Sequence, residues 1–450
     1  MAANASKVPF LRAVARRGFS ANTCPRPIGQ TAEVETTVLS NKVVIACADS
    51  TLPITRVSVV FRAGSRNESY ENQGASHMMR IAAGMTTMKS TGFAITRNIQ
   101  QIGGILSCTG DREIVSYTVE ATANNIETGL RYLQDVIEPA FKPWELSDSI
   151  PRIRNQVEAV SPQVRAVELM HRAAFRSGLG NSIYIPKYQI GKISSESLLH
   201  YVASNCTADR CAVVGVGIDQ NTLTGFTQCL ELCPSSSSGG SGSSKSDAGN
   251  YYGGDARKET AGNMAHVAIG GLGGAMSNQK ESLAFAVLQN AIGAAPATKY
   301  GSTSGSLGKA VTSAVGGASV SLAMVNKSYT DAGIFGAVVS ADSRVIGKAV
   351  DAVMRTLKSC NVSSDDVNRA KNMVKAEVME SYATDGCLLA EMGMQAVLTK
   401  QVMSVDAIIA AIDAITQKDV QDAARKAGSS KLSLGAIGNL ANVQYASDLA

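Results

Sequence analysis

The sequence predicts an α+β protein with two similar halves, each a mixed or antiparallel sheet with helices packed on it. Three observations support this fold class: the chain length, a Ser/Gly-rich segment near the middle, and the same order of strands and helices on both sides of that segment. At 450 residues the chain exceeds what one hydrophobic core usually organises, since domains hold about 100 to 200 residues. We therefore expect two domains.

The segment that separates the halves reads PSSSSGGSGSSKSDAGNYYGGD, residues 234–255. Ser and Gly dominate it, so it buries too little apolar surface to fold by itself and is typical of a flexible tether. We predict a linker over 234–258, an N-terminal domain over 33–233 and a C-terminal domain over 259–450.

Short β-branched or alternating runs bounded by Gly or polar residues predict strands in both halves. They cover residues 56–64, 113–122, 210–218, 265–273 and 431–438. The stretch QIGGILSCTGDREIVSYTVE reads as a hairpin, with Gly110 and Asp111 in the turn. Because the helices come in pairs after the strands, we expect them on one face of each sheet.

Two amphipathic helices, within 121–137 and 340–357, show that the halves repeat each other. Each follows a strand-like run and leads through a polar turn into a long second helix. One constant offset aligns their apolar positions at helical spacing, and these positions are Ile126, Leu130, Leu133 and Ile137 with Ile346, Val350, Val353 and Leu357. We interpret the chain as an internal duplication.

Composition and charge exclude several functions. Hydrophobic residues make up 45%, charged residues 18% and aromatic residues 5%, which describes a globular protein without a platform for stacking bases. The net charge of +5 rests on five cations that precede the first acid, Glu33, namely Lys7, Arg12, Arg16, Arg17 and Arg26. A nucleic-acid reader carries its basic face on a folded domain, so we expect no nucleic-acid partner.

The N-terminal stretch MAANASKVPFLRAVARRGFSANT contains no acid and is rich in Ala, Arg and Ser. Its apolar residues lie opposite its arginines on a helix, which is typical of a mitochondrial transit peptide, the alternative being a disordered basic tail. We predict a transit peptide over 1–19, cleaved between Phe19 and Ser20, because RGFS resembles a matrix-processing site.

No stretch reaches the roughly 18 consecutive apolar residues that a spanning helix needs, so we expect a soluble or peripheral protein. The nine cysteines are scattered, and only Cys229 and Cys233 approach a metal-binding spacing. No second pair completes a four-ligand site. We expect reduced thiols.

Residues 74–84, GASHMMRIAAG, begin like an inverted zinc motif, H-x-x-E-H, on a helix. In that motif two imidazoles at i and i+4 share one face and a Glu at i+3 acts as general base. The three positions here are His77, Arg80 and Ile81.

The stretch GSRNESYENQGASHMM resembles the start of the pitrilysin-type zinc peptidases, whose relatives include mitochondrial processing peptidase and the core subunits of ubiquinol:cytochrome c reductase. The resemblance spans the mature chain and implies two processing-peptidase-like domains. In active members a further Glu completes the zinc site, and their spacing, counted from Ile81, leads to Glu158.

The residues at these positions do not fit hydrolysis. Catalytic zinc needs three protein ligands and an activated water; Ile81 has no lone pair, and Arg80 puts a fixed positive charge where the base belongs. We therefore expect no catalytic residue, metal or cofactor, and interpret His77 and Glu158 as inherited helix residues. His171, His200 and His266 have no partners at ligand spacing.

In peptidase relatives the second half carries an Arg and a Tyr that help to bind substrate, ahead of a pattern like S-Y-x-D-x-G. The corresponding positions here are Ser306 and Val320, ahead of SYTDAG. Both substrate-binding groups are therefore absent, in agreement with the zinc motif.

Inactive mitochondrial relatives are of two kinds, and the resemblance to core subunits of the reductase is the better one. The α subunits of processing peptidase carry a long glycine-rich loop, whereas NAIGAAPATKYGSTSGSLGKA has no GGGG-type run. The resemblance implies a non-catalytic scaffold on the matrix side of the inner membrane, peripheral to it. Its partners would be a second, core protein 1-like subunit and the other subunits of complex III. A substrate-binding α-type subunit is the alternative.

Overall fold

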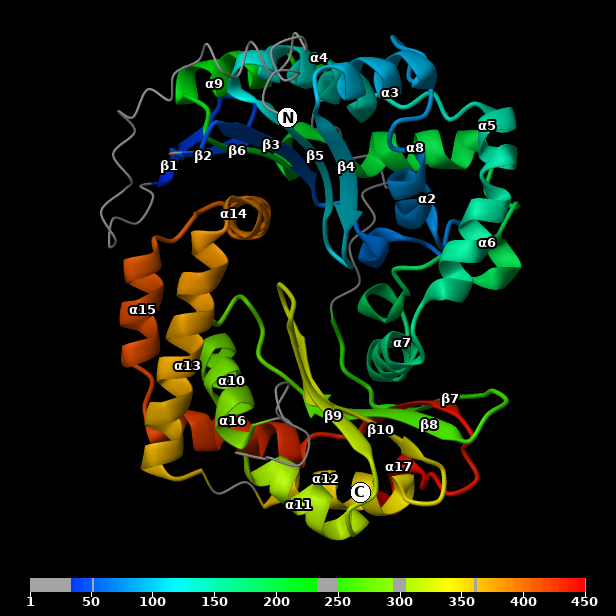
Figure 1. Cartoon of the computed structure of the whole chain (residues 1–450), viewed down its shortest axis with the longest axis vertical. Helices are drawn as coiled ribbons and strands as arrows, with labels where there is room; N and C mark the ends of the chain where they lie inside the picture. The colour runs from blue at the N-terminus through cyan, green and yellow to red at the C-terminus, as the bar shows by residue number, and fades with distance from the viewer. Residues whose placement is uncertain (1–33, 51, 233–248, 294–304, 360–361, 450) are drawn as a thin grey trace, which may run out of the picture.

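The computed structural model describes residues 34–50, 52–232, 249–293, 305–359 and 362–449. The predicted transit peptide 1–19, its cleavage position between Phe19 and Ser20, and residues 234–248 of the predicted linker lie outside the described residues. The described chain forms two halves, one above the other in Figure 1, each with one sheet and a set of helices.

The first half contains a six-stranded sheet in the order β1-β2-β6-β3-β5-β4. Its strands are β1 (Val34–Val38), β2 (Val44–Ala48), β3 (Ile54–Phe61), β4 (Ile105–Gly110), β5 (Val115–Thr122) and β6 (Cys211–Val216). Its helices are α2 (Ala75–Ala82), α3 (Gly92–Gln101), α4 (Ile126–Ile137), α5 (Pro143–Asp148), α6 (Ile150–Ala159), α7 (Pro162–Phe175), α8 (Ser195–Asn205) and α9 (Gln220–Gln228).

The second half contains a five-stranded sheet in the order β7-β11-β8-β10-β9. Its strands are β7 (Gly254–Glu259), β8 (Met264–Leu272), β9 (Val320–Ser328), β10 (Gly333–Asp342) and β11 (Ser433–Gly438). Its helices are α10 (Gln279–Ile292), α11 (Ser306–Val315), α12 (Ile346–Lys358), α13 (Ser364–Ala383), α14 (Asp385–Leu398), α15 (Val405–Asp413), α16 (Gln417–Ser429) and α17 (Ala446–Leu449).

Apart from the additional edge strand β1, the two sheets share one topology, which confirms the predicted repeat. The pairs β2–β6 and β7–β11 are parallel, and the pairs β3–β6, β3–β5 and β4–β5 match the antiparallel pairs β8–β11, β8–β10 and β9–β10. The predicted hairpin is β4–β5, with Asp111 and Ile114 closing its turn through a backbone hydrogen bond of 2.9 Å. The helices α4 and α12 occupy the predicted repeat positions.

Local sequence explains several helix starts. Thr91, Ser161 and Asp219 each accept a hydrogen bond from a backbone N–H in the first turn of α3, α7 and α9, which satisfies donors that a helix start leaves free. Thr416 and Asp419 form a capping box at the start of α16.

Each half lends one helix to the sheet of the other half, and both helices lie between the sheets in Figure 1. The first-half helix α7 packs on β8, β10 and β11, and the second-half helix α14 packs on β2, β3 and β6. Gly435 lets the α7 backbone touch β11, since a Cβ there would overlap Ala166 O and Met170 N. The expectation that helices cover one face of each sheet is therefore wrong, because the exchanged helix buries the other face.

The predicted boundary at residue 258 is also wrong. Tyr252 N donates to Ala174 O at 2.7 Å, and β7 follows directly as an edge strand parallel to β11. The strand reads GDARKE and is half-buried to exposed, so its polar composition hides it from hydrophobic patterning.

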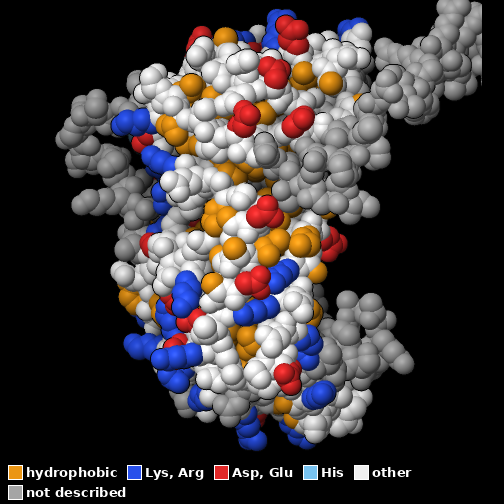
Figure 2. All heavy atoms as spheres, turned by 90° about the vertical axis from the view of Figure 1, so that its left-hand side faces the viewer, with side chains coloured by type: hydrophobic (Ala, Val, Ile, Leu, Met, Phe, Trp, Pro, Cys, Tyr) orange, Lys and Arg blue, Asp and Glu red, His pale blue; other side chains and the backbone are white. Residues whose placement is uncertain are grey.

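Figure 2 shows the face that carries α13, α14 and α15, where hydrophobic, acidic and basic side chains are interspersed. Within the described part of the chain, no helix combines the length and the hydropathy that crossing a bilayer requires.

Candidate functional site

The helix with the zinc-like motif, α2, starts on a buried carboxylate. Glu68 accepts hydrogen bonds from Gly74 N and Ser76 N, both at 2.8 Å, and from Ser76 Oγ at 2.6 Å. A negative group is stabilised at a helix N-terminus by the free N–H groups and the helix dipole, yet burial dominates here and raises the pKa of Glu68 to about 7. Glu68 was not among the predicted site residues, because no local sequence signal marks this loop acid as the cap of α2.

His77 is buried on α2, and its imidazole is hydrogen-bonded to two groups. Nδ1 accepts from Ile185 N at 3.3 Å, so the proton of the neutral ring is on Nε2, and the imidazole also bonds to Gln156. The ring stands edge-on to Tyr184 at 5.8 Å. Burial, and then the charge of Arg80, lower the pKa of His77 to about 4. His77 is therefore neutral at physiological pH and has no free lone pair for a metal.

Arg80 occupies the place of the general base. Its guanidinium donates to the carbonyl of Ile183, and burial lowers its pKa below the usual value of an arginine. Gly110 leaves room for this side chain, since a Cβ there would lie 3.0 Å from Arg80 Cδ. A cation fixed one turn from His77 opposes the binding of a second cation.

Ile81, at the position of the second zinc ligand, is 3% exposed and belongs to the hydrophobic core of the first half. It packs in the same cluster as Ile95 and Ile99 of α3. Ile81 therefore contributes to the hydrophobic core at the position where the zinc motif has its second ligand.

The structure does not bring Glu158 to His77. The Glu158 side chain is 67% exposed and reaches Lys187 Nζ at 3.4 Å, whereas the residue of α6 that bonds to His77 is Gln156. Residues two apart in a helix point to opposite sides, so only one of the two can face α2. The count from Ile81 thus leads two positions past Gln156, the residue of α6 that bonds to His77.

The lost substrate-binding positions lie in the second half. Ser306 is the first residue of α11, exposed, with its Oγ 3.4 Å from Ile292 O. Val320 is the first residue of β9 and packs against the core of that half. Neither carries an ionisable group, and within the described ranges no group of three or more His, Cys, Asp or Glu side chains could hold a metal ion.

The remaining histidines have structural surroundings. His171 is fully buried on α7; its Nδ1 lies 2.8 Å from Val167 O and its Nε2 accepts from Tyr329 Oη at 2.9 Å. Burial holds its pKa well below 6.5. His266 Nδ1 lies 2.8 Å from Ser340 Oγ between β8 and β10, and His200 is exposed.

The SYTDAG segment has a role that the sequence did not reveal, since it joins the halves. Glu113, in the β4–β5 turn, accepts from Thr330 N at 3.1 Å and pairs with Arg66 Nη1 at 2.6 Å. Arg66 also donates to Asp331 Oδ1 at 2.8 Å. The two hairpins thus meet at their turns through an ionic network.

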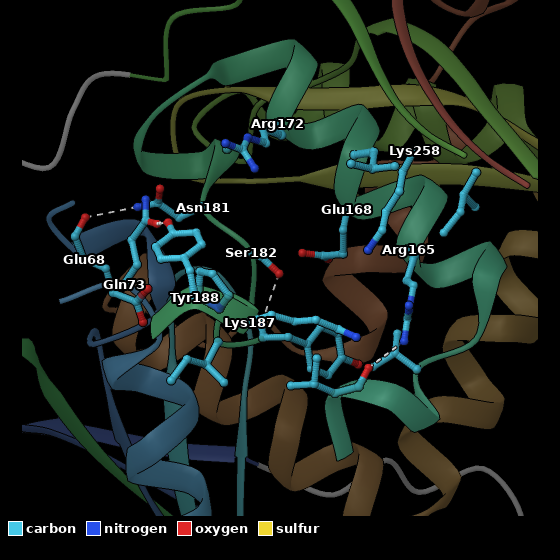
Figure 3. Close-up of a pocket in the computed structure, with 18 of the residues that line it drawn as sticks. Glu68, Gln73, Arg165, Glu168, Arg172, Asn181, Ser182, Lys187, Tyr188 and Lys258 are labelled. Carbon is cyan, nitrogen blue, oxygen red and sulfur yellow. Dashed lines mark hydrogen bonds between the residues drawn. The ribbon is translucent and has the colours of Figure 1, made fainter. Parts of the chain in front are cut away.

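A cavity of about 380 Å³ lies beside α2, between α7, the 180–188 segment and the edge of the second sheet. Figure 3 shows polar and charged side chains around it, among them Arg165, Glu168, Lys187 and Lys258.

Comparison with known sequences agrees with this geometry. Residues 43–187 match the family model for insulinase (peptidase family M16), and residues 192–374 match the model for the peptidase M16 inactive domain. The mitochondrial cytochrome b-c1 complex subunit 2 of Homo sapiens is 33% identical over 428 residues, 93% of each chain, and that of Rattus norvegicus is 35% identical over 427 residues, again 93% of each. A probable mitochondrial-processing peptidase subunit alpha-1 of Arabidopsis thaliana is 25% identical over 441 residues, 92% of this chain and 84% of that one. The chain therefore belongs to the peptidase M16, or insulinase, family.

Proposed function

We propose that this chain is core protein 2, a non-catalytic structural and assembly subunit of the mitochondrial ubiquinol:cytochrome c reductase. Identities of 33% and 35% over nearly the whole chain to subunit 2 of the cytochrome b-c1 complex support this role. The proposal places the protein in mitochondria, peripheral on the matrix side of the inner membrane, after removal of residues 1–19.

The observation that supports a non-catalytic role is the identity and environment of the residues at the zinc-motif positions of α2. Arg80 stands in place of the base, Ile81 is built into the core, and the His77 imidazole is hydrogen-bonded to Ile185 N and to Gln156. Peptide hydrolysis by a bound zinc ion needs three protein ligands and an open coordination position on the metal, and the residues of this helix do not provide such a site. We therefore assign no catalytic residue, metal or cofactor, and treat His77, Arg80 and Ile81 as vestigial positions. Ser306 and Val320 are the proposed positions of lost substrate-binding groups.

The partners that follow are a second core subunit, similar to core protein 1, and the remaining subunits of complex III. The name of the relatives, a subunit of the cytochrome b-c1 complex, supports an assembly of several chains. In this role the chain contributes surface and shape, while the redox groups belong to other subunits.

The alternative is an inactive, substrate-binding α-type subunit of the mitochondrial processing peptidase. The α subunits of that enzyme align over most of the chain at 25–27% identity, below the value for the mammalian b-c1 subunits. That difference favours the reductase.

Depletion of the chain in its own cells separates the two roles. A core subunit predicts loss of assembled reductase and of its antimycin-sensitive activity, with precursor cleavage unchanged. An α-type subunit predicts accumulation of uncleaved precursors in isolated mitochondria before the reductase declines, and this order of events would contradict the proposal.

A further inference from the structure

The cavity beside α2 is assembled from both halves of the chain. Arg165, Glu168 and Arg172 come from α7, and Lys258 comes from β7, which joins the second sheet. Its volume of about 380 Å³ lies within the range of small-molecule pockets, about 300–1,000 Å³.

Cations outnumber acids in its lining. The five cations are Arg165, Arg172, Arg176, Lys187 and Lys258, and the two acids are Glu68 and Glu168. Both acids have internal partners: Glu68 caps α2, and Glu168 binds Arg112 Nη2 at 2.7 Å and Ile183 N at 3.2 Å. Neither carboxylate is therefore available to neutralise the cationic side of the cavity.

Most of these cations have no acidic partner among the described residues. Lys187 pairs with Glu158 at 3.4 Å, but Arg165 donates to the neutral carbonyl oxygens of Val157 and Glu158, and Arg176 lies over the ring of Tyr252. Arg172 and Lys258 are exposed to solvent. In Figure 3, Arg165, Lys187 and Lys258 lie on one side of the cavity, with Glu168 beside them. Such a cluster in a concave site attracts multivalent anions.

Aromatic rings border the same space. Tyr70 is 79% exposed and Tyr188 is 49% exposed, and both line the cavity together with Tyr184. Tyr188 Oη donates to Gln73 Oε1 at 2.5 Å, which fixes the ring. These rings offer a flat apolar surface in the lining of the cavity that also carries the cations.

We propose that this cavity binds an oligophosphate, a small anion with two or more linked phosphate groups. Arg172, Arg165 and Lys258 would hold the phosphate oxygens, because guanidinium and ammonium groups form short charge-assisted bonds to them. Binding would join α7 of the first half to β7 of the second. The inference is independent of membership in the reductase.

Isothermal titration of the purified mature full-length chain with inorganic tripolyphosphate at low salt tests this inference. We expect saturable binding of one anion per chain, and a loss of affinity of about tenfold or more in R172E/K258E. The matched control is R344E/K348E, which reverses one exposed Arg and one exposed Lys around α12, on the opposite face of the second sheet from α7. The control should bind like the unchanged chain.

An absence of saturable binding would overturn the proposed site. Equal losses of affinity in R172E/K258E and in the control R344E/K348E would also overturn it, because they would show that only the overall charge of the protein matters. R172Q/K258Q repeats the test without new acids if the charge reversals disturb folding, as judged by circular dichroism. Citrate should bind at least about tenfold more weakly than tripolyphosphate, and equal binding would contradict a phosphate site. ATP is expected to bind more tightly than tripolyphosphate and to lose that advantage in Y188A.

Discussion

Arg66 Nη1 lies 2.6 Å from Glu113 Oε1, and both side chains also bond to the SYTDAG turn of the other half. Their side chains are 4% and 5% exposed. The pair therefore stands where the β4–β5 and β9–β10 hairpins meet, and it links the halves at a point that is well shielded from water. Removal of one partner from a buried ion pair costs far more than the loss of an exposed pair.

The first prediction concerns this pair. E113A should lower the free energy of unfolding by about 3 kcal/mol, because it leaves the Arg66 charge with Asp331 alone. Urea denaturation followed by circular dichroism measures the change. The matched control is E120A on the next strand, which removes a partially exposed pair with Arg56 and should cost about 1 kcal/mol or less. Equal costs would show that the hairpin contact adds nothing.

A second prediction rebuilds the zinc site. R80E/I81H/Q156E supplies a base, a second imidazole one turn from His77 and a carboxylate at the position that bonds to His77. This variant should therefore bind one zinc per chain by atomic absorption and rise in Tm with zinc. R80E/I81H alone keeps Glu158, which points to Lys187, and should bind zinc at least about tenfold more weakly. Equal affinity in the two variants would restore Glu158 as the third position.

A third prediction follows from His77. Its pKa falls from 6.5 to about 4 in the folded protein. Its contribution to the free energy of unfolding is therefore present above pH 6.5 and is lost as the pH falls from 6.5 toward 4. Relative to H77Q, the unchanged chain should lose about 3 kcal/mol of stability over that window. A parallel pH dependence of the two proteins in urea titrations would argue against a buried neutral imidazole.

Glu68 provides the opposite pH dependence. Burial raises its pKa from 4.5 to about 7. Its contribution to the free energy of unfolding is therefore present below pH 4.5 and is lost as the pH rises from 4.5 through 7. Compared with E68Q, the unchanged chain should lose about 3 kcal/mol across this range. The same urea titrations measure this loss. A constant difference in unfolding free energy between the unchanged chain and E68Q from pH 4.5 to 7 would contradict the raised pKa of Glu68.

The exchange of helices predicts that the halves depend on each other. Residues 34–248 produced alone lack α14, and residues 249–450 produced alone lack α7, so each leaves one sheet face uncovered. We expect both fragments to aggregate separately and to form a 1:1 complex when produced together, as measured by size-exclusion chromatography with light scattering. Two stable monomeric fragments would show that the exchanged helices are dispensable.

Patterns within single elements were predictable, and relations between distant elements were not. The apolar spacing of α4 and α12 predicted both helices and the repeat, because one face of each meets its own sheet. The apolar residues Leu388, Leu389 and Met392 indicate a buried helix, yet no local pattern says that the burying sheet is that of the other half.

The candidate site was likewise predictable from the sequence only where residue type alone decides. The interpretation against zinc chemistry came from the residue types of Arg80 and Ile81 alone, and in the structure Arg80 is half-buried while Ile81 is buried. The choice between Gln156 and Glu158 depends on the rotation of α6, and the role of Glu68 depends on a loop that folds back on α2. Neither relation is encoded in sequence spacing.

Blue-native electrophoresis of mitochondria, with an antibody to this chain, tests the central proposal most directly. A core subunit predicts that the chain migrates in one large assembly together with cytochromes b and c1, and that the soluble matrix fraction contains none of it. A single band at the mass of a soluble two-subunit peptidase, without cytochromes, would contradict the proposal.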